Sequence, residues 1–467
     1  MPSADLVLPA RMSRVAVVAP RSRVREALVR LARGGCVELV GNLPPAEGEE
    51  AEALRRLTHG GRPGGAAPAL LASPPNVPAL EQAGESGLLA GEVELGRRAR
   101  LALERGSFSA WLGWAPTAQI EQLNMELAEV GSAVVELPRP SWVEPPTLFR
   151  PVAVEQPFRP LVQSYGTARY RDVDPTAFTA VSFVAMFGMM FGDVGHGLVL
   201  ALLALWLRRR RHGRLAALRH LWPIPFAAGL AGAGFGFLYG EAFGPTHLVP
   251  RLWLNPLDRP VPLLVVALAA GAGLLTVSYL LGIVNRWRES GFGEALVAQS
   301  GIAGLTIFTG GGICAGGYYW HRLAIEIAGG AVAGIGLALL GVGLVLKADG
   351  GAAAVTQAGV ELVDAVIRLA SNLISFTRLA AFGLMHAALG AVVFDAARAL
   401  WGGVVGGLAA AVVFVLGNLI AFALEALVTG VQALRLEYYE LYSRIFSGEG
   451  HAFAPWSMPV LSSEEES

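Results

Sequence analysis

Long apolar runs separated by short polar breaks fill the sequence from Ala177 onward, and they constrain the fold more than any other feature. A helix needs about 20 residues to cross the hydrocarbon core of a bilayer. Several of the runs reach or exceed that length. The composition agrees, because 54% of the 467 residues are hydrophobic and only 16% are charged, against about a quarter in soluble domains. The sequence therefore predicts a polytopic α-helical membrane protein.

The apolar runs divide into eight predicted spans. The first run, Ala177 to Leu207, is too long for one span, and its glycines would break it into two short ones. The other six run approximately over residues 218–239, 261–284, 297–320, 323–346, 360–396 and 404–436. The last two approach 35 residues, or roughly 50 Å, so we expect them to tilt steeply or to extend beyond the bilayer.

Basic residues support this count. Arg208 to Arg211 with Arg214 follow the second span, Arg286 and Arg288 follow the fourth, and Lys347 follows the sixth. With eight spans, all of them fall on the side of the N-terminal region, which the positive-inside bias makes cytoplasmic. One span over Ala177 to Leu207 would place the densest arginine cluster outside. We therefore expect both termini in the cytoplasm.

The sequence before Pro175 is mixed in polarity and predicts a small α+β domain. Strand patterns at Arg14–Val18 and Val37–Val40 flank a helical pattern, and a strand-helix-strand unit follows between Trp111 and Leu137. Residues 44–86 are rich in glycine, proline, alanine and glutamate, which indicates a loop broken by one short helix near 49–57. The predicted domains are 1–174, a cytoplasmic domain, 175–446, a transmembrane domain, and 447–467, a cytoplasmic tail.

The charge, the cysteines and the motifs of the sequence disfavour several classes of function. The net charge of -1 gives no argument for a nucleic-acid partner, and Cys36 and Cys314 lie in regions of different polarity, so we expect no disulfide framework. No basic stretch followed by an apolar core, the mark of a cleaved signal peptide, opens the sequence. Phosphate-binding loops, paired-cysteine metal sites and Ser/His/Asp arrangements are not found. We therefore expect no cofactor and no ATP hydrolysis by this chain itself.

The dense glycines of spans five and six (Gly310 to Gly312, Gly329, Gly330 and Gly334) favour close helix packing over a ligand loop.

Arg378 is the most informative single residue, since it stands in an apolar stretch of membrane length, Ile367 to Val393. A charge at the centre of a membrane helix costs roughly 2.5 to 3.5 kcal/mol on insertion scales, and such residues usually face protein or water and serve a function. No acidic residue close by in the same span would pair with it.

The predicted topology orders other titratable groups by depth around Arg378. The seventh span runs outward, so Asp364 and Arg368 come near the cytoplasm and His386 lies about 12 Å outward of Arg378. The eighth span runs inward. The complete set of candidate ion-route residues is Asp364, Arg378, His386, Glu425, Gln432 and Arg435. Such ladders mark proton or ion routes.

Each member also has a simpler interpretation. Arg368 and Arg435 could snorkel to an interface, and Glu425 could be a structural partner of Arg378 or Arg435. His386 alone could be a packed, hydrogen-bonded histidine.

The string Phe187 to Gly197 (FGMMFGDVGHG) is the most specific local pattern. Asp193 and His196 stand three apart, which superficially resembles a metal pair. With no third ligand nearby in sequence, we expect no metal and instead a polar hairpin in which Asp193 satisfies exposed backbone N–H groups. Glu241, in YGEAFG, ends the third span in a similar way.

These strings resemble the membrane stator subunit, called a or I, of rotary vacuolar and archaeal-type ATPases. The resemblance runs from about Pro145 to Trp456 and includes QPFRPLVQSYG, FGMMFGDVGHG, LGIVNRWR, SNLISFTRLAAFGLMHA and LEALVTGVQALRLEYYELYSRIFSGEGHAFAPW. The GWAP string at Gly113 to Pro116 also fits.

The resemblance implies ion translocation, most simply of protons, as the half-channel subunit of a rotary motor in the plasma membrane of a prokaryote. It implies as partners a proteolipid c-ring, peripheral stalks and a catalytic head. Arg378 would face the ring and attract its carboxylate, and would separate two offset half-channels. Glu425 and Arg435 would lie on the partner helix, His386 toward the outer half-channel and Asp364 toward the cytoplasmic one.

Two departures accompany the resemblance. Members usually carry a longer N-terminal region with a hairpin of long helices, whereas residues 44–86 cannot form a long coiled coil, which implies a shortened arm. Gln432 stands where eukaryotic members often have histidine. Two other functions remain open: a stand-alone secondary transporter that uses Arg378 and Glu425, and a structural homologue that does not conduct.

Overall fold

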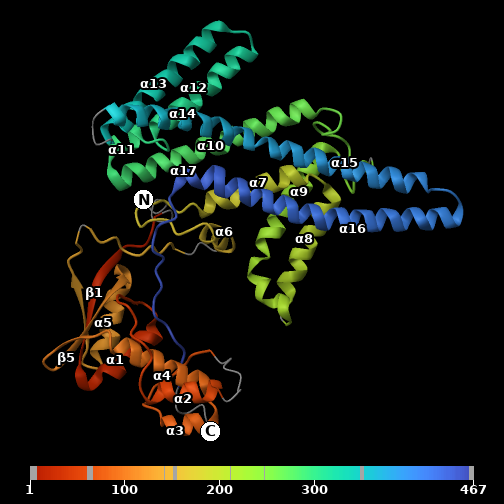
Figure 1. Ribbon diagram of the computed structural model, residues 1–467. Helices are drawn as coiled ribbons and strands as arrows, with labels where there is room; N and C mark the ends of the chain where they lie inside the picture. The colour runs from red at the N-terminus through yellow and green to blue at the C-terminus, as the bar shows by residue number, and fades with distance from the viewer. Residues whose placement is uncertain are drawn as a thin grey trace. The chain divides into compact units, whose positions relative to one another are not determined.

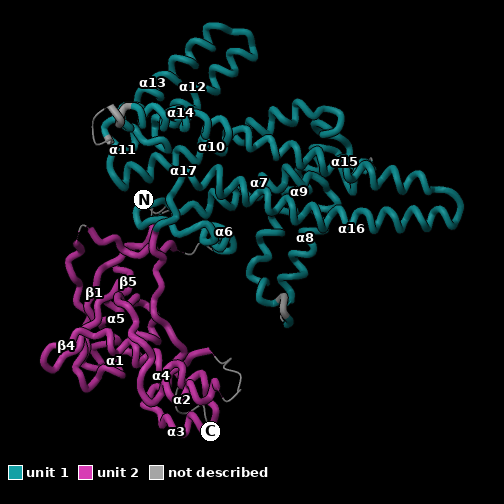
Figure 2. The backbone as a smooth tube through the Cα atoms, in the orientation of Figure 1, with its two compact units in different colours: residues 1–8, 151–449 teal, residues 9–150, 450–467 magenta. Residues whose placement is uncertain are grey.

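The structure, a computed structural model, describes residues 8–59, 67–140, 142–150, 155–210, 212–246, 248–347 and 352–461. Two compact units make up the chain, one of residues 1–8 and 151–449 and one of residues 9–150 and 450–467 (Figure 2). Pro175 marks the start of the first apolar helix, but the units divide at Arg150. Arg211 and the side chains of Arg214 and Lys347, which the charge argument used, lie outside the described part.

The smaller unit is built on an antiparallel sheet of order β2-β5-β1-β6, with β4 also paired to β5. Its strands are β1 (Met12–Pro20), β2 (Glu38–Leu39), β4 (Leu103–Arg105), β5 (Phe108–Pro116) and β6 (Ala133–Leu137). Alternate side chains of β1, such as Val15 and Val17, are fully buried against the apolar stripe of α1 (Val24–Gly34). The period of two in the sequence thus places one face of the sheet in the core.

The other helices of this unit cover the same core or a neighbouring one. They are α2 (Glu49–His59), α3 (Val77–Ala83), α4 (Ser86–Ala99) and α5 (Ile120–Ala128). The region predicted as a loop with one helix also contains α3 and a strand, β3 (Leu70–Leu71), which pairs with β7 (Val460–Leu461). As expected from its prolines and glycines, the described part of this region forms short elements and no long coiled coil. A small unit of mixed α and β structure is confirmed.

The larger unit is helical. Its main helices are α7 (Thr176–Phe191), α8 (Val194–Arg209), α9 (Pro223–Tyr239), α10 (Pro260–Ser290), α11 (Phe292–Val297), α12 (Ile302–Tyr319), α13 (Leu323–Lys347), α14 (Ala352–Ser375), α15 (Thr377–Ala399) and α16 (Gly403–Leu436). Among the described residues, five helical segments are long and apolar enough to cross a membrane: 260–290, 292–319, 323–346, 356–399 and 403–445. The chain is thus a mostly helical, multi-pass membrane protein, and a count of eight would also need the shorter α7, α8 and α9.

The long apolar run Ala177 to Leu207 is broken in two, as its glycines predict. α7 ends at Phe191, and α8 begins at Val194 after a turn of two residues. The glycines beyond the turn serve packing. A Cβ on Gly197 would lie 2.4 Å from the backbone N of Ala233 in α9, so the α8–α9 hairpin needs a glycine there.

The seventh predicted span, approximately 360–396, is not one continuous helix. α14 ends at Ser375, Phe376 forms a turn, and α15 begins at Thr377. The Phe376 side chain is fully buried, and Gly271 of α10 makes room for it: a Cβ at Gly271 would lie 2.2 Å from Phe376 Cγ. The break puts Arg378 in the first turn of a helix.

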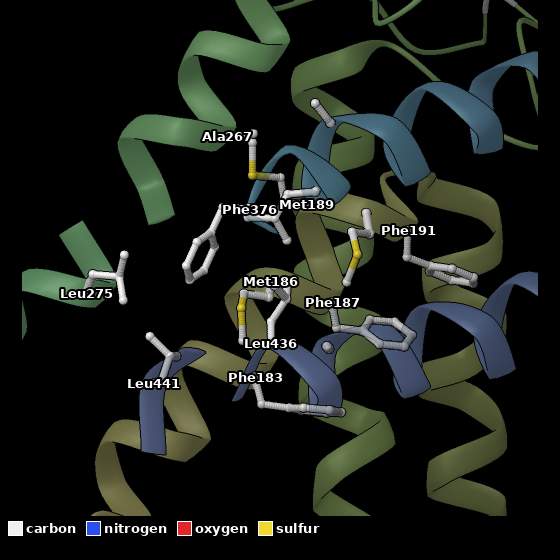
Figure 3. Close-up of a cluster of buried hydrophobic side chains, with 14 of the residues drawn as sticks. Phe183, Met186, Phe187, Met189, Phe191, Ala267, Leu275, Phe376, Leu436 and Leu441 are labelled. Carbon is white, nitrogen blue, oxygen red and sulfur yellow. The ribbon is translucent and has the colours of Figure 1, made fainter. Parts of the chain in front are cut away.

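Two long helices organise the unit. α15 and α16 run side by side, and α7 packs against both (Figure 1). The α8–α9 hairpin runs across the direction of α15 and α16 in the same view. Aromatic and methionine side chains of α7 fill the core between these helices, with Phe376 and Leu436 among their neighbours (Figure 3). The polar groups described next lie along this core.

Candidate functional site

His386 of α15 joins two carboxylates that come from distant parts of the chain. Its Nδ1 contacts Glu425 Oε2 of α16, and its Nε2 lies 3.8 Å from Asp193 Oδ2. The three residues are almost fully buried, with 4%, 5% and 0% exposure in that order. Buried charges are stable only when paired, so each of these groups depends on the others. Glu425 therefore has a histidine as its partner and not Arg378 or Arg435, the two alternatives drawn from the sequence.

Asp193 fixes the turn between α7 and α8. Its Oδ1 accepts a hydrogen bond from the backbone N–H of His196 at 2.8 Å, and its Oδ2 accepts one from Gly244 at 3.0 Å. The backbone N–H of Val194 donates to the carbonyl of Glu241 at 3.0 Å. The turn is thus tied to the loop that follows α9, and backbone N–H groups are satisfied by Asp193 as the hairpin prediction required. Glu241 is itself buried, with 2% exposure.

His196 lies beside His386 on the same cluster. The two ring centroids are 5.5 Å apart at an interplanar angle of 87°. Asn418 of α16 places its Oδ1 3.1 Å from His196 Nε2, whereas His196 Nδ1 is buried without a hydrogen-bond partner among the described residues. Asn418 was not predicted, although an amide inside the apolar run 404–436 is a signal of the same kind as Glu425. We call Asp193, His196, His386, Asn418 and Glu425 the histidine cluster.

A second polar group lies toward the other end of α16. There the chain passes through a π-helix, η6 (Glu437–Tyr442), of a kind that often occurs at functional sites. In the amide orientation that satisfies both neighbours, Asn372 of α14 donates to Glu440 Oε2 at 3.1 Å and accepts from Arg444 Nη2 at 2.8 Å. We call Asn372, Glu440 and Arg444 the asparagine cluster. None of its members was predicted, because all stand close to helix ends where polar residues are common.

A cavity of about 540 Å³ opens at the asparagine cluster. Asn372 and Arg444 line it together with Glu361 and Arg368 of α14, and Arg286 and Glu294 contribute from other helices. Charged and amide side chains in such a wall can hold water. The cavity therefore has a largely polar wall at one end of the helical unit.

The remaining predicted residues are less enclosed. Asp364 forms an ion pair with Arg368 one turn further along α14, and both side chains are about half exposed. Arg435 is exposed, in keeping with the snorkelling alternative. Gln432 is half-buried, and its Oε1 has no hydrogen-bond partner within the described chain.

Arg378 lies between the two clusters in chain order along α14 and α15. Its Nη1 is buried, and the described residues give its guanidinium no hydrogen bond and no ion pair. Its guanidinium attracts the carboxyl group of Glu440 electrostatically. Arg444 and Arg435 attract the same carboxyl group.

Multi-pass helices that bury ionisable side chains define a class of membrane proteins in which such groups mark ion pathways. Comparison with known sequences shows which proteins the chain is similar to. The V-type ATPase 116kDa subunit family matches residues 103–219. Subunit I of the A-type ATP synthase of Pyrococcus abyssi is 30% identical over 379 residues, which cover 76% of this chain and 54% of the relative.

Two further relatives agree. Subunit I of the A-type ATP synthase of Archaeoglobus fulgidus is 26% identical over 395 residues, covering 74% of this chain and 58% of the relative. The human V-type proton ATPase 116 kDa subunit a 3 is 35% identical over 143 residues, covering 28% of this chain and 17% of the relative. The chain is therefore similar in sequence to these ATPase and ATP synthase subunits, as its sequence strings indicated. It spans about half the length of the archaeal relatives that it matches.

Proposed function

We propose that this chain is the ion-translocating stator subunit of a V-type or A-type rotary ATPase or ATP synthase, and that it moves protons. Arg378 carries the proposal, since it stands between the two polar clusters in chain order and its Nη1 is buried without a hydrogen-bond partner among the described residues. A permanent positive charge without a counter-ion inside a membrane protein is costly. A carboxylate on a second protein, a ring of proteolipid subunits, would supply the missing partner.

The two polar clusters would serve as the ends of two half-channels. The cavity beside Asn372 and Arg444 would connect Arg378 to the cytoplasm, with Asp364 and Arg368 near its mouth. The histidine cluster would connect it to the outside, because His386 can pass a proton between Glu425 and Asp193. Gln432 and Arg435 would lie on α16 between the clusters.

Arg378 would drive release and prevent leakage. An opposite charge nearby favours the ionised form of a carboxyl group, so a ring carboxyl that reaches Arg378 would give up its proton there. It would take a new proton from the other half-channel after rotation. A fixed cation between the half-channels would also repel any proton that moved directly from one to the other.

The proposal includes a topology and a place in the cell. Eight spans with both termini in the cytoplasm of a prokaryote would use α7, α8 and α9 in addition to the five long segments. Residues 1–174 would form a shortened stator arm that meets peripheral stalks, residues 175–446 the translocation domain, and residues 447–467 a cytoplasmic tail.

Replacing Arg378 tests the proposal. We expect Arg378→Ala to reduce ATP-driven proton pumping in membrane vesicles to the background level, while native gels show the complex assembled. Arg398→Ala is the matched control, because Arg398 is exposed in the last turn of the same helix. Pumping by Arg378→Ala at a substantial fraction of the wild-type rate would contradict the mechanism.

Purification from native membranes tests the class of protein. We expect an affinity-tagged chain to bring down a small two-helix proteolipid and ATPase head subunits. Proton or anion transport by the purified chain alone in liposomes would instead support a secondary transporter.

A further inference from the structure

The histidine cluster has a geometry that its hydrogen bonds do not explain. Asp193, His196 and His386 each offer one ligand atom, and these three atoms lie within 4.8 Å of one another. All three side chains are buried. They come from the α7–α8 turn, from α8 and from α15, so the fold gathers ligands that the sequence keeps almost 200 positions apart. The third ligand that the pair Asp193 and His196 lacks in sequence is thus present in space.

Neighbouring side chains orient both imidazole rings. Asn418 Oδ1 lies 3.1 Å from Nε2 of His196, and Glu425 forms an ion-pair contact with Nδ1 of His386. The ring nitrogens left over are Nδ1 of His196 and Nε2 of His386. Metal-binding histidines in proteins almost always have their second nitrogen held by a carboxylate, carbonyl or amide group in this way.

Two of the ligand atoms can accept a further bond. His196 Nδ1 is buried without a hydrogen bond in the described part of the chain, and His196 is 2% exposed. Asp193 Oδ2 accepts one backbone N–H, which leaves it a second lone pair. It lies 3.8 Å from His386 Nε2, whereas two ligands of a tetrahedral zinc ion, each about 2.0 to 2.1 Å from the metal, stand roughly 3.4 Å apart. This one pair is thus within a few tenths of an ångström of the spacing in a zinc site, and all three ligand atoms lie within 4.8 Å of one another.

We propose that Asp193, His196 and His386 form a binding site for a divalent transition-metal ion, with Zn²⁺ the best fit. Two imidazole nitrogens and one carboxylate oxygen suit zinc and its neighbours and disfavour the hard cations Mg²⁺ and Ca²⁺, which take oxygen ligands. Three protein ligands leave a fourth position for water, as in open zinc sites. Glu425 and Asn418 are positioning residues that orient the ligand rings.

A cavity lies against one side of the site. A cavity of about 310 Å³ reaches His196 and Asn418, and Phe243, Phe414 and Phe422 form part of its wall. An ion bound at His386 would occupy the nitrogen that faces Asp193. One consequence rests on the proposed function. A bound zinc ion would interrupt proton transfer through the outer half-channel and inhibit pumping.

Metal binding can be measured without any ion transport. The full-length chain, purified without a polyhistidine tag and stripped with a chelator, would be dialysed against buffered micromolar free Zn²⁺ and analysed for bound metal. We expect one zinc per chain, with X-ray absorption showing nitrogen and oxygen ligands at about 2.0 to 2.1 Å and no sulfur. A chain with Cys36→Ser and Cys314→Ser should bind equally well.

Variants assign the site. His196→Gln and Asp193→Asn should lose the bound zinc, and Glu425→Gln, which leaves all three ligands in place, should weaken affinity by about 10- to 100-fold. His220→Gln, at an exposed histidine outside the cluster, should bind as the wild type does. Circular dichroism and thermal melting would verify that each variant is folded.

Three outcomes would overturn the metal site: no zinc bound by the wild-type chain, full occupancy in folded His196→Gln, or unchanged affinity in folded Glu425→Gln. If a ligand variant fails to fold, the Glu425→Gln affinity decides. Zinc bound without inhibition of the assembled complex would support the site and contradict only the route of ions through His386.

Discussion

Asp172 lies outside the membrane-spanning helices, in the segment that leads to α7, and only 1% of its surface is exposed. Burial raises the pKa of its carboxyl group from 3.8 to about 6, and the nearby negative charge of Glu289 adds to the effect. One hydrogen bond from the backbone N–H of Arg169 opposes this shift. Asp172 therefore makes stability depend on pH.

The sign follows from proton binding. The unfolded chain releases this proton near pH 4 and the folded chain near pH 6, so stability falls as the pH rises between these values and is constant above them. The loss is on the order of 3 kcal/mol, from about two pKa units. We expect Asp172→Asn to flatten the dependence of the thermal midpoint on pH across this window, measured in detergent. Glu121→Gln, at an exposed carboxyl, should leave the wild-type slope, and an equal slope in Asp172→Asn would contradict the assignment.

Which site residues can be found from sequence depends on their surroundings. Arg378, His386 and Glu425 stand out because a charge or imidazole inside an apolar run is costly. Asn372 and Glu440 do not, because each sits where a run gives way to polar residues. The pairing of Glu425 with His386 was also beyond reach, since it depends on which faces α15 and α16 turn toward each other.

At the scale of elements, the glycines of α12 and α13 fall into two groups. A Cβ on Gly310 would lie 2.3 Å from the backbone N of Ala333, and one on Gly329 would lie 2.3 Å from that of Cys314. Gly311, Gly312, Gly330 and Gly334 have no atom within 4 Å of such a Cβ. Close packing thus explains two of the predicted glycines, and the others point away from the contact.

This difference yields a matched pair of variants. Gly310→Ala should destabilise the α12–α13 hairpin by about 1 to 3 kcal/mol, because helix backbones would have to separate to admit the methyl group. Gly311→Ala, one position along, should be neutral or slightly stabilising, because alanine favours the helix and meets open space. Thermal melting of the purified chain compares the two, and equal midpoints would contradict the contact.

The break at Phe376 shows where sequence reasoning on elements stops. No proline or glycine stands between Ser371 and Ala381, so the segment looks continuous. The turn is stabilised by a tertiary contact instead, since the buried ring of Phe376 fills the space that Gly271 leaves on α10. Local sequence predicts well that a segment is helical. Where the helix is interrupted depends on packing between helices that are distant in sequence.

For the whole molecule, the proposed topology makes a direct prediction. With Cys36 and Cys314 replaced by serine, a single cysteine at exposed His212 should react with an impermeant maleimide only in inverted vesicles. One at exposed His321, beyond α12, should react only in right-side-out vesicles. Labelling of both from the same side would exclude eight spans with cytoplasmic termini.

The division into a mixed α/β unit and a helical unit was predictable because composition changes sharply near Pro175. The boundary at Arg150 was not, since residues 155–175 are polar and yet fold with the helices. A long-range hydrogen bond holds this polar segment to the helical unit: the backbone N–H of Val173 donates to Oδ1 of Asn285 in α10 at 2.9 Å. A hydrogen bond across 112 positions leaves no local trace in the sequence.

The α8–α9 hairpin crosses the direction of α15 and α16 (Figure 1). This crossing affects whether distance along the long helices corresponds to depth in the membrane. Helices that cross in this way cannot all stand upright in one bilayer, and α16, with 34 residues, is the one that can take a steep tilt. Distance along α15 then becomes sideways displacement more than depth. Arg378 and His386, both on α15 and 8 positions apart, are separated by roughly 12 Å along its axis. Neighbouring helices pack about 8 to 10 Å apart, so this displacement corresponds to an arc of about one helix on the rim of the proposed ring. The length of one tilted helix segment would thus set how far the rotor must turn between taking up a proton and releasing it.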